Sequence, residues 1–209
     1  MNVLERIAYY QGRRDEGPNQ ELAHDLARRE DRQGIEEIAA NLSSKDRNVQ
    51  SDCLKVLYEI GYLKPELIAD HVNDFLGLLK SKNNRMVWGA MIATATVSTI
   101  RPKEIWRSID DVLAAIEAGS LITVVWGVKA LAGVASTNKR YRDRLFPVLM
   151  RQLRSCIPRD VPTHAESILP AVDGDTSATY LSTLKRRQGE LTASQQARLR
   201  KVLRRLERA

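Results

Sequence analysis

Cysteine, histidine, glycine, proline and aromatic residues are all scarce in this 209-residue sequence. Its two cysteines, Cys53 and Cys156, and its three histidines form no C-x-x-C or other metal-ligand spacing. We therefore expect no disulfide framework and no metal site, and reduced thiols favour a cytoplasmic location. A phosphate-binding glycine loop and a G-x-S-x-G signature are missing as well, so we predict no cofactor and no catalytic residue.

Long apolar runs are also missing. No stretch reaches the roughly 18 residues that a membrane span requires. The first eleven residues carry Glu5 and Arg6 in place of the apolar core of a signal peptide. We expect a protein that neither enters a membrane nor carries a leader. With aromatics at only 5%, Leu, Ile, Val and Ala supply the apolar content, as is typical of helix-on-helix packing.

A repeat of about 37 residues is the main feature that is present. Lys64-Pro65-Glu66 returns 37 residues later as Arg101-Pro102-Lys103-Glu104, and Val87-Trp88-Gly89 returns 38 residues later as Val125-Trp126-Gly127. An apolar frame with the spacing i, i+3, i+4, i+7 occurs four times at a step of 37, which predicts one helix per repeat. The four frames, which we call outer helices, begin at Ile35, Val72, Ile109 and Phe146.

A second helix is predicted in each repeat after a short polar link. These inner helices are expected near 47–60, 84–99, 120–136 and 161–172, and Ser, Asp or Asn in the links would cap them. Pro65 and Pro102 are expected to start two outer helices. Residues 1–33 and 176–209 are expected to be N-terminal and C-terminal capping helices, the first of them over residues 2–11. Residues 34–175 are expected to be the repeats, all within a single domain 1–209. Thr192 and Gln195 predict a capping box.

With these units laid out, the chain resembles the HEAT-repeat proteins of the armadillo-like group over about residues 30–175. The resemblance lies in the valines that open three inner helices, Val49, Val87 and Val125, although the arginine that often follows is absent. It implies an all-α fold, a right-handed α-α superhelix of HEAT-like helical hairpins with about five helix pairs. Such arrays serve mostly as binding scaffolds.

A row of four residues follows the repeated valine position at a step of 38: Gln50, Trp88, Trp126 and His164. If this row faces the concave groove, its tryptophans form an aromatic strip for a protein or peptide partner. The alternative is that both indoles pack in the core, because Trp88 has Met91 and Ile92 one turn later. The acidic or amide pairs at 36–37, 73–74 and 110–111 also recur, which indicates a solvated face of the outer helices.

Positive charge gathers at the C-terminal end. Residues 1–138 hold 17 Lys and Arg against 19 Asp and Glu, whereas residues 139–209 hold 16 against 7. This end is predicted either to bind nucleic acid or to be a solvated end cap. The basic set on the last two predicted helices comprises Lys185, Arg186, Arg187, Arg198, Arg200, Lys201, Arg204 and Arg205.

The sequence therefore predicts a non-enzymatic scaffold that binds a protein or peptide through its groove. The alternative is a nucleic-acid-binding array that uses the basic side. Some HEAT-like arrays are DNA glycosylases that use groove tryptophans and an acidic residue, but the acidic residue has no counterpart beside the tryptophan row here. The oligomeric state is left open.

Overall fold

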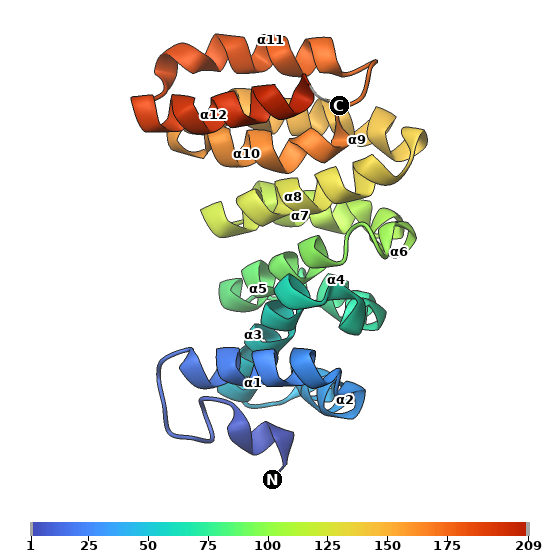
Figure 1. Cartoon of the computed structure of the whole chain (residues 1–209). Helices are drawn as coiled ribbons and strands as arrows, with labels where there is room; N and C mark the ends of the chain where they lie inside the picture. Colours follow the sequence, from blue (N-terminus) through green and yellow to red (C-terminus); the bar gives the residue numbers. More distant parts are fainter. Residues whose placement is uncertain (1, 208–209) are drawn as a thin grey trace. The chain divides into compact units, whose positions relative to one another are not determined.

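The computed structural model describes residues 2–207 and is helical throughout (Figure 1). Within that range there are twelve α-helices, seven short 3-10 helices and no strand. The all-α class is therefore as predicted. The α-helices are α1 (Gly17–Arg29), α2 (Arg32–Ala40), α3 (Arg47–Leu63), α4 (Val72–Leu78), α5 (Asn84–Thr96), α6 (Pro102–Arg107), α7 (Ile109–Ala118), α8 (Leu121–Thr137), α9 (Lys139–Ser155), α10 (Val161–Ile168), α11 (Ser177–Arg187) and α12 (Ala193–Leu206).

The chain forms two compact units, Met1–Thr123 and Val124–Ala209. In unit 1, the inner helices pack in succession, α1 on α3 and α3 on α5, while α2 packs on α3 and α4 on α5 (Figure 1). This is the predicted alternation of inner and outer helices. The predicted limits of the caps and repeats, and the single domain 1–209, stay predictions.

Close approach of the inner helices explains the small residues in α5. A Cβ atom added to Gly89 would lie 2.7 Å from Cδ2 of Leu54 on α3. Any larger residue at this position would force the Leu54 side chain to shift, so glycine favours the close packing of the two helices. The core between them contains Leu57, Met91 and Ala93, which are fully buried.

The predicted caps are present. The Asp46 carboxylate accepts a hydrogen bond from the Asn48 amide, 2.8 Å, and the Asn83 side chain accepts one from the Arg85 amide, 3.0 Å. These contacts satisfy amides that a helix start leaves unpaired. Because the two caps are 37 residues apart, they also fix how α3 and α5 correspond, residue by residue.

Two outer segments differ from the single helices expected after Pro65 and Pro102. The first is divided into η3 (Pro65–Leu67), η4 (Ala69–His71) and α4, and the second into α6 and α7. The divisions fall at Ile68 and Ser108, whose backbones have ψ near zero, 1° and 21°. Each proline does begin its segment, as predicted. These repeats therefore have a short first helix in addition to the expected pair.

The N-terminal start is also shorter than expected. The predicted helix over residues 2–11 is reduced to the 3-10 helix η1 (Val3–Arg6), because Ile7 adopts an extended backbone. The Asn19 side chain accepts a hydrogen bond from the Ala8 amide, 2.9 Å, which fixes this segment against α1. The remaining short helices are η2 (Asn41–Ser43), η5 (Pro158–Asp160), η6 (Leu169–Ala171) and η7 (Gln188–Glu190).

In unit 2, α9 packs on both α10 and α11, and α10 packs on α12. The hydroxyl of the fully buried Tyr180 on α11 donates a hydrogen bond to the Ala165 carbonyl on α10, 2.6 Å. The capping box at Thr192 and Gln195 is confirmed, with both reciprocal hydrogen bonds in place at the start of α12. These contacts hold the basic helices α11 and α12 against α9 and α10.

Candidate binding surface on the inner helices

Three aromatic side chains meet on the inner helices of unit 1, and we call Tyr58, Tyr62 and Trp88 the aromatic cluster. The Tyr58 ring lies 5.8 Å from the Tyr62 ring and 6.2 Å from the Trp88 ring, centre to centre, with tilted planes. Tyr62 is 43% exposed, Trp88 is partly exposed and Tyr58 is buried. The cluster is thus an aromatic surface on a buried base, the kind of feature that anchors partners at interfaces.

A buried lysine supports this cluster. Lys55, one turn before Tyr58 on α3, places its ammonium 4.9 Å from the Tyr58 ring centre. The same ammonium donates to Glu59, 2.6 Å, and is ion-paired with Glu16, 2.7 Å. A cation over an aromatic face is attracted by the ring, and the two carboxylates balance its charge. This network orders Tyr58 and thereby the exposed ring next to it.

Burial and charge act in opposite directions on these groups. Burial lowers the pKa of Lys55, but hydrogen bonds to Glu16 and Glu59 together raise it by more. The resulting pKa lies above the ordinary lysine value. Burial raises the pKa of Tyr58 and of Tyr62. The lysine is therefore charged and both tyrosines are neutral hydrogen-bonding groups at neutral pH. The aromatic cluster itself, Tyr58, Tyr62 and Trp88, therefore carries no charge at neutral pH.

Trp126 forms a smaller arrangement of the same kind in unit 2. It lies on α8, is partly exposed, and has the ammonium of the exposed Lys129 4.6 Å from its ring centre. Burial lowers the pKa of Lys129. Both predicted tryptophans thus reach the surface in part, each beside a lysine-containing aromatic contact. Neither is wholly in the core, which was the alternative.

The four-residue row is not brought together in full. The caps at Asp46 and Asn83 place Gln50 opposite Val87, and Ser51 opposite Trp88, so the step of 38 is one residue out of register here. One residue is about 100° around a helix. Gln50 accordingly faces the outer helices, where its amide donates to the Leu42 carbonyl, 2.6 Å. Trp88 faces the inner surface instead.

His164 is buried on α10, with 1% of its surface exposed. Neither ring nitrogen has a hydrogen-bond partner among the described residues, and neither has Oδ2 of the buried Asp160. Burial lowers the pKa of His164, while the Asp160 charge raises it by less. A partner would have to displace the surrounding side chains to reach this imidazole, so it adds nothing to an exposed surface.

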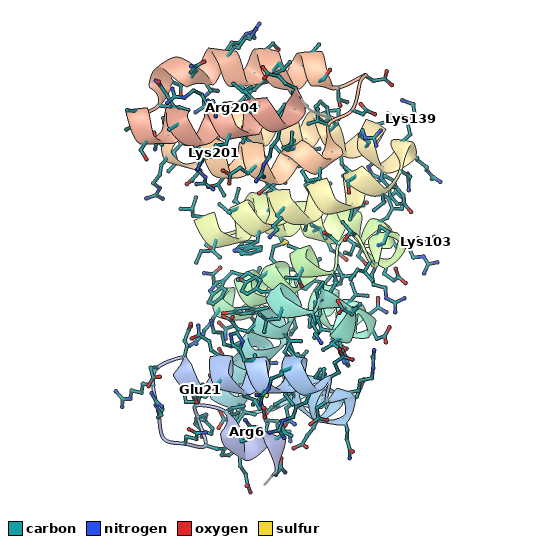
Figure 2. The ribbon with its side chains drawn as sticks, in the orientation of Figure 1. Arg6, Glu21, Lys103, Lys139, Lys201 and Arg204 are labelled. Atoms are coloured by element: carbon teal, nitrogen blue, oxygen red, sulfur yellow. The ribbon has the colours of Figure 1, made fainter. Side chains whose placement is uncertain are left out.

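The predicted basic set contains both residues that are held by partners within the protein and residues that are exposed. Arg187 is 7% exposed and donates to three backbone carbonyls near the end of α9, those of Leu153, Arg154 and Cys156, at 2.7–2.8 Å. Arg198 is paired through two nitrogens with Glu166. Figure 2 labels Lys201 and Arg204 on α12. Six of the predicted residues are exposed and have no carboxylate partner among the described ion pairs: Lys185, Arg186, Arg200, Lys201, Arg204 and Arg205.

Lys55, Tyr58 and Tyr62 were not singled out from the sequence. A signal for them is present, because Lys55–Glu59 and Tyr58–Tyr62 are both i, i+4 pairs on one helix. Cys53 is fully buried, and burial raises its pKa to about 12. Over residues 2–207 no group of His, Cys, Asp and Glu could hold a metal ion. In the same range no helix is long and apolar enough to cross a membrane.

No protein-family model and no curated protein matches the chain. Solved structures do. A designed armadillo repeat protein in complex with a (KR)4 peptide is 14% identical, with a TM-score of 0.67 over 97% of both chains. An engineered protein is 19% identical, with a TM-score of 0.64 over 99% of this chain and 97% of the other. Computationally designed armadillo repeat proteins for modular peptide recognition reach a TM-score of 0.63 at 12% identity.

Proposed function

We propose that the protein is a scaffold that binds an extended peptide or protein segment through its inner helices. Its armadillo-like repeat fold supports this proposal. The observation that carries the proposal is the aromatic cluster, in which the exposed Tyr62 ring and the partly exposed Trp88 ring flank the buried Tyr58. Trp126 with Lys129 is a separate candidate contact of the same type, within unit 2.

Physical reasons favour a peptide over a small molecule. The cluster is an open surface of tilted rings, whereas small-molecule sites are enclosed and mostly apolar. Rigid aromatic side chains supply contact area at a low cost in conformational entropy. The hydroxyl of the exposed Tyr62 can hydrogen-bond to the backbone of an extended segment, because its raised pKa keeps it protonated at neutral pH. A peptide with apolar or aromatic side chains fits this chemistry best.

The solved structures support the proposal at the level of the scaffold. Two of the designed armadillo proteins are described as peptide-bound or as made for peptide recognition. Their sequences are 12% and 14% identical to this one, which is too low to carry over contacts. The choice of binding residues therefore rests on the aromatic cluster itself.

Selection from a random-peptide library displayed on phage, with the full chain as bait, tests this function. The enriched peptides should be synthesised and their affinities measured for the wild type, Tyr62→Ala and Tyr10→Ala. Tyr10 is a matched control, because it is an exposed tyrosine whose ring contacts Tyr9. We expect Tyr62→Ala to weaken binding at least roughly tenfold, since central aromatic anchors contribute about 1–2 kcal/mol or more. Tyr10→Ala should bind like the wild type.

Two results would reject the proposal. One is a set of enriched peptides that bind Tyr62→Ala and Trp126→Ala as tightly as the wild type. The other is a library that yields no peptide while the wild type is shown to be folded by its circular dichroism. Because Tyr62 is 43% exposed, its replacement should leave the fold in place.

Nucleic-acid binding is a second candidate, and the six exposed cations of α11 and α12 are the observation that favours it. Binding to a short DNA duplex should then fall steeply with added salt, because each phosphate contact releases a counterion. Replacing Lys201 and Arg204 by Gln should reduce that salt dependence, whereas Tyr62→Ala should not. Absence of binding at low salt would remove this candidate and leave the peptide scaffold.

A further inference from the structure

Two grooves on the outer side of unit 1 correspond to each other. The first outer groove lies between α2 and α4, has a volume of about 620 Å³, and is lined in part by Glu36, Gln50, His71 and Asp74. The second outer groove lies between α7 and the segment that links α4 to α5, and has a volume of about 370 Å³. At the step of 37 fixed by the helix caps, their lining residues match: Ser43 with Lys80, Gln50 with Val87, Asp74 with Asp111, and Gly77 with Ala114.

The second outer groove contains its own cation. The Lys80 ammonium lies 3.0 Å from Oδ2 of Asp111, and both residues line that groove. In the first outer groove the residue that corresponds to Lys80 is Ser43, whereas the acid is retained as Asp74. The first groove thus has the anion without the lysine that pairs with it one repeat later. The larger volume of the first groove agrees with this missing side chain.

The first outer groove is also more anionic. The nearly buried His71 places Nε2 3.4 Å from Oε1 of Glu36 and Nδ1 3.6 Å from Oδ2 of Asp74. Both contacts are longer than an ordinary hydrogen bond. Both carboxylates are well exposed, with side chains 69% and 58% accessible. They therefore keep oxygens that can accept hydrogen bonds from a ligand.

This arrangement does not fit a metal ion. The two carboxylates lie at opposite nitrogens of one ring, and those nitrogens point in different directions. A single ion cannot reach all three groups at the roughly 2 Å distances that zinc requires. An ammonium on a flexible chain has no such requirement, because each of its three N–H groups can find a different acceptor.

We propose that the first outer groove binds the side chain of a lysine from a partner protein. The ammonium would lie between Asp74 and Glu36, as the Lys80 ammonium lies beside Asp111. Ala39, Leu42 and Leu78 would contact the alkyl chain, since all three line the groove. This site is separate from the aromatic cluster, because none of Tyr58, Tyr62 and Trp88 lines the groove, and it does not depend on the proposed peptide function.

An NMR titration of the full chain with Nα-acetyl-lysine amide tests the site. Saturable shifts are expected at the amides of Ser43 and Gly77, with a dissociation constant on the order of 1 mM or weaker. The matched probe is Nα-acetyl-norleucine amide, which lacks the ammonium. Equal shifts with the two probes, or no shift at these amides with the lysine probe, would overturn the proposal.

Four variants sharpen the test. Asp74→Asn should weaken binding by about fivefold, the upper end for one partly exposed ion pair. Glu66→Gln is the charge-matched control, because Glu66 is exposed and lies outside the groove. Ser43→Lys should abolish binding by supplying an internal cation, as Lys80 does. Lys80→Ser should create binding at the second outer groove, seen as new shifts at Ala114. If Asp74→Asn and Ser43→Lys both bind like the wild type, the assignment is wrong.

Discussion

Lys55 in unit 1 and Arg187 in unit 2 are both almost completely buried cations, 6% and 7% exposed, yet they serve different purposes. Lys55 is held by two carboxylates beside an aromatic ring at the surface. Arg187 donates to three backbone carbonyls at the end of α9 and to Glu190. The acceptors differ in kind. Arg187 stabilises the end of a helix through backbone carbonyls, whereas Lys55 stabilises an aromatic surface through side-chain carboxylates.

Breaking the Arg187 contacts should have the largest effect. Arg187→Met removes the donors for three carbonyls that belong to a helix end and to the turn after it. Leaving such groups buried without partners should destabilise unit 2 by about 3 kcal/mol. Hydrogen exchange of the α9 and α11 amides should speed up accordingly, with unit 1 unchanged. Arg186→Met replaces an exposed neighbour. It should change the free energy of opening, measured by the same exchange, by less than about 0.5 kcal/mol.

Breaking the Lys55 contacts should cost less. Lys55→Met keeps the packing volume but leaves Glu16 and Glu59 without their cation, and both have some access to water. We expect a loss of about 1–2 kcal/mol, measured by urea unfolding. The same variant should also weaken peptide binding, because Tyr58 loses the cation over its ring. A loss of stability as large as that of Arg187→Met would contradict the distinction between the two cations.

Replacing His164 should change how the stability of the protein depends on pH. Burial lowers its pKa in the folded state, whereas the unfolded chain takes up the proton near pH 6.5. Below that pH the unfolded state binds more protons, so stability falls as the pH falls from 7 toward 5. His164→Leu should remove this part of the drop in urea midpoints between pH 7 and pH 5. The same replacement at the exposed His24 should leave the drop unchanged.

The exposed pair between Arg198 and Glu166 should have the smallest effect. Both side chains are substantially accessible, 46% and 35%, so water and salt compete with the pair. Arg198→Gln should change the stability of unit 2 by less than about 1 kcal/mol, and added salt should make the difference smaller still. A thermal unfolding midpoint that moves as far as in Arg187→Met would show that geometry and burial were misjudged here.

Short-range features were predictable from the sequence. The caps at Asp46 and Asn83 and the capping box at Thr192 depend on residues at most three positions apart, so local chemistry decides them. The 37-residue step also predicted the alternation of inner and outer helices, because the apolar frames Ile35–Leu42 and Val72–Leu79 mark one helix face each.

Features that depend on distant partners were not predictable. The charge of Arg187 suggested a surface residue, but its acceptors lie 31 to 34 positions earlier in the chain. The row through Gln50 and Trp88 relied on the repeated valine, whereas the caps set the register one residue differently. The division of the outer segments at Ile68 and Ser108 likewise has no mark in the apolar pattern.

Peptide binding at the aromatic cluster can be followed through the indole N–H signals of the three tryptophans. Each signal can be assigned by replacing one tryptophan with Phe, and a library-selected peptide can then be titrated against the full chain. We expect the Trp88 signal to move with saturation while that of Trp106, on α6, stays in place. In Tyr62→Ala the same movement should need at least roughly tenfold more peptide. A peptide that binds tightly without moving the Trp88 signal would contradict it.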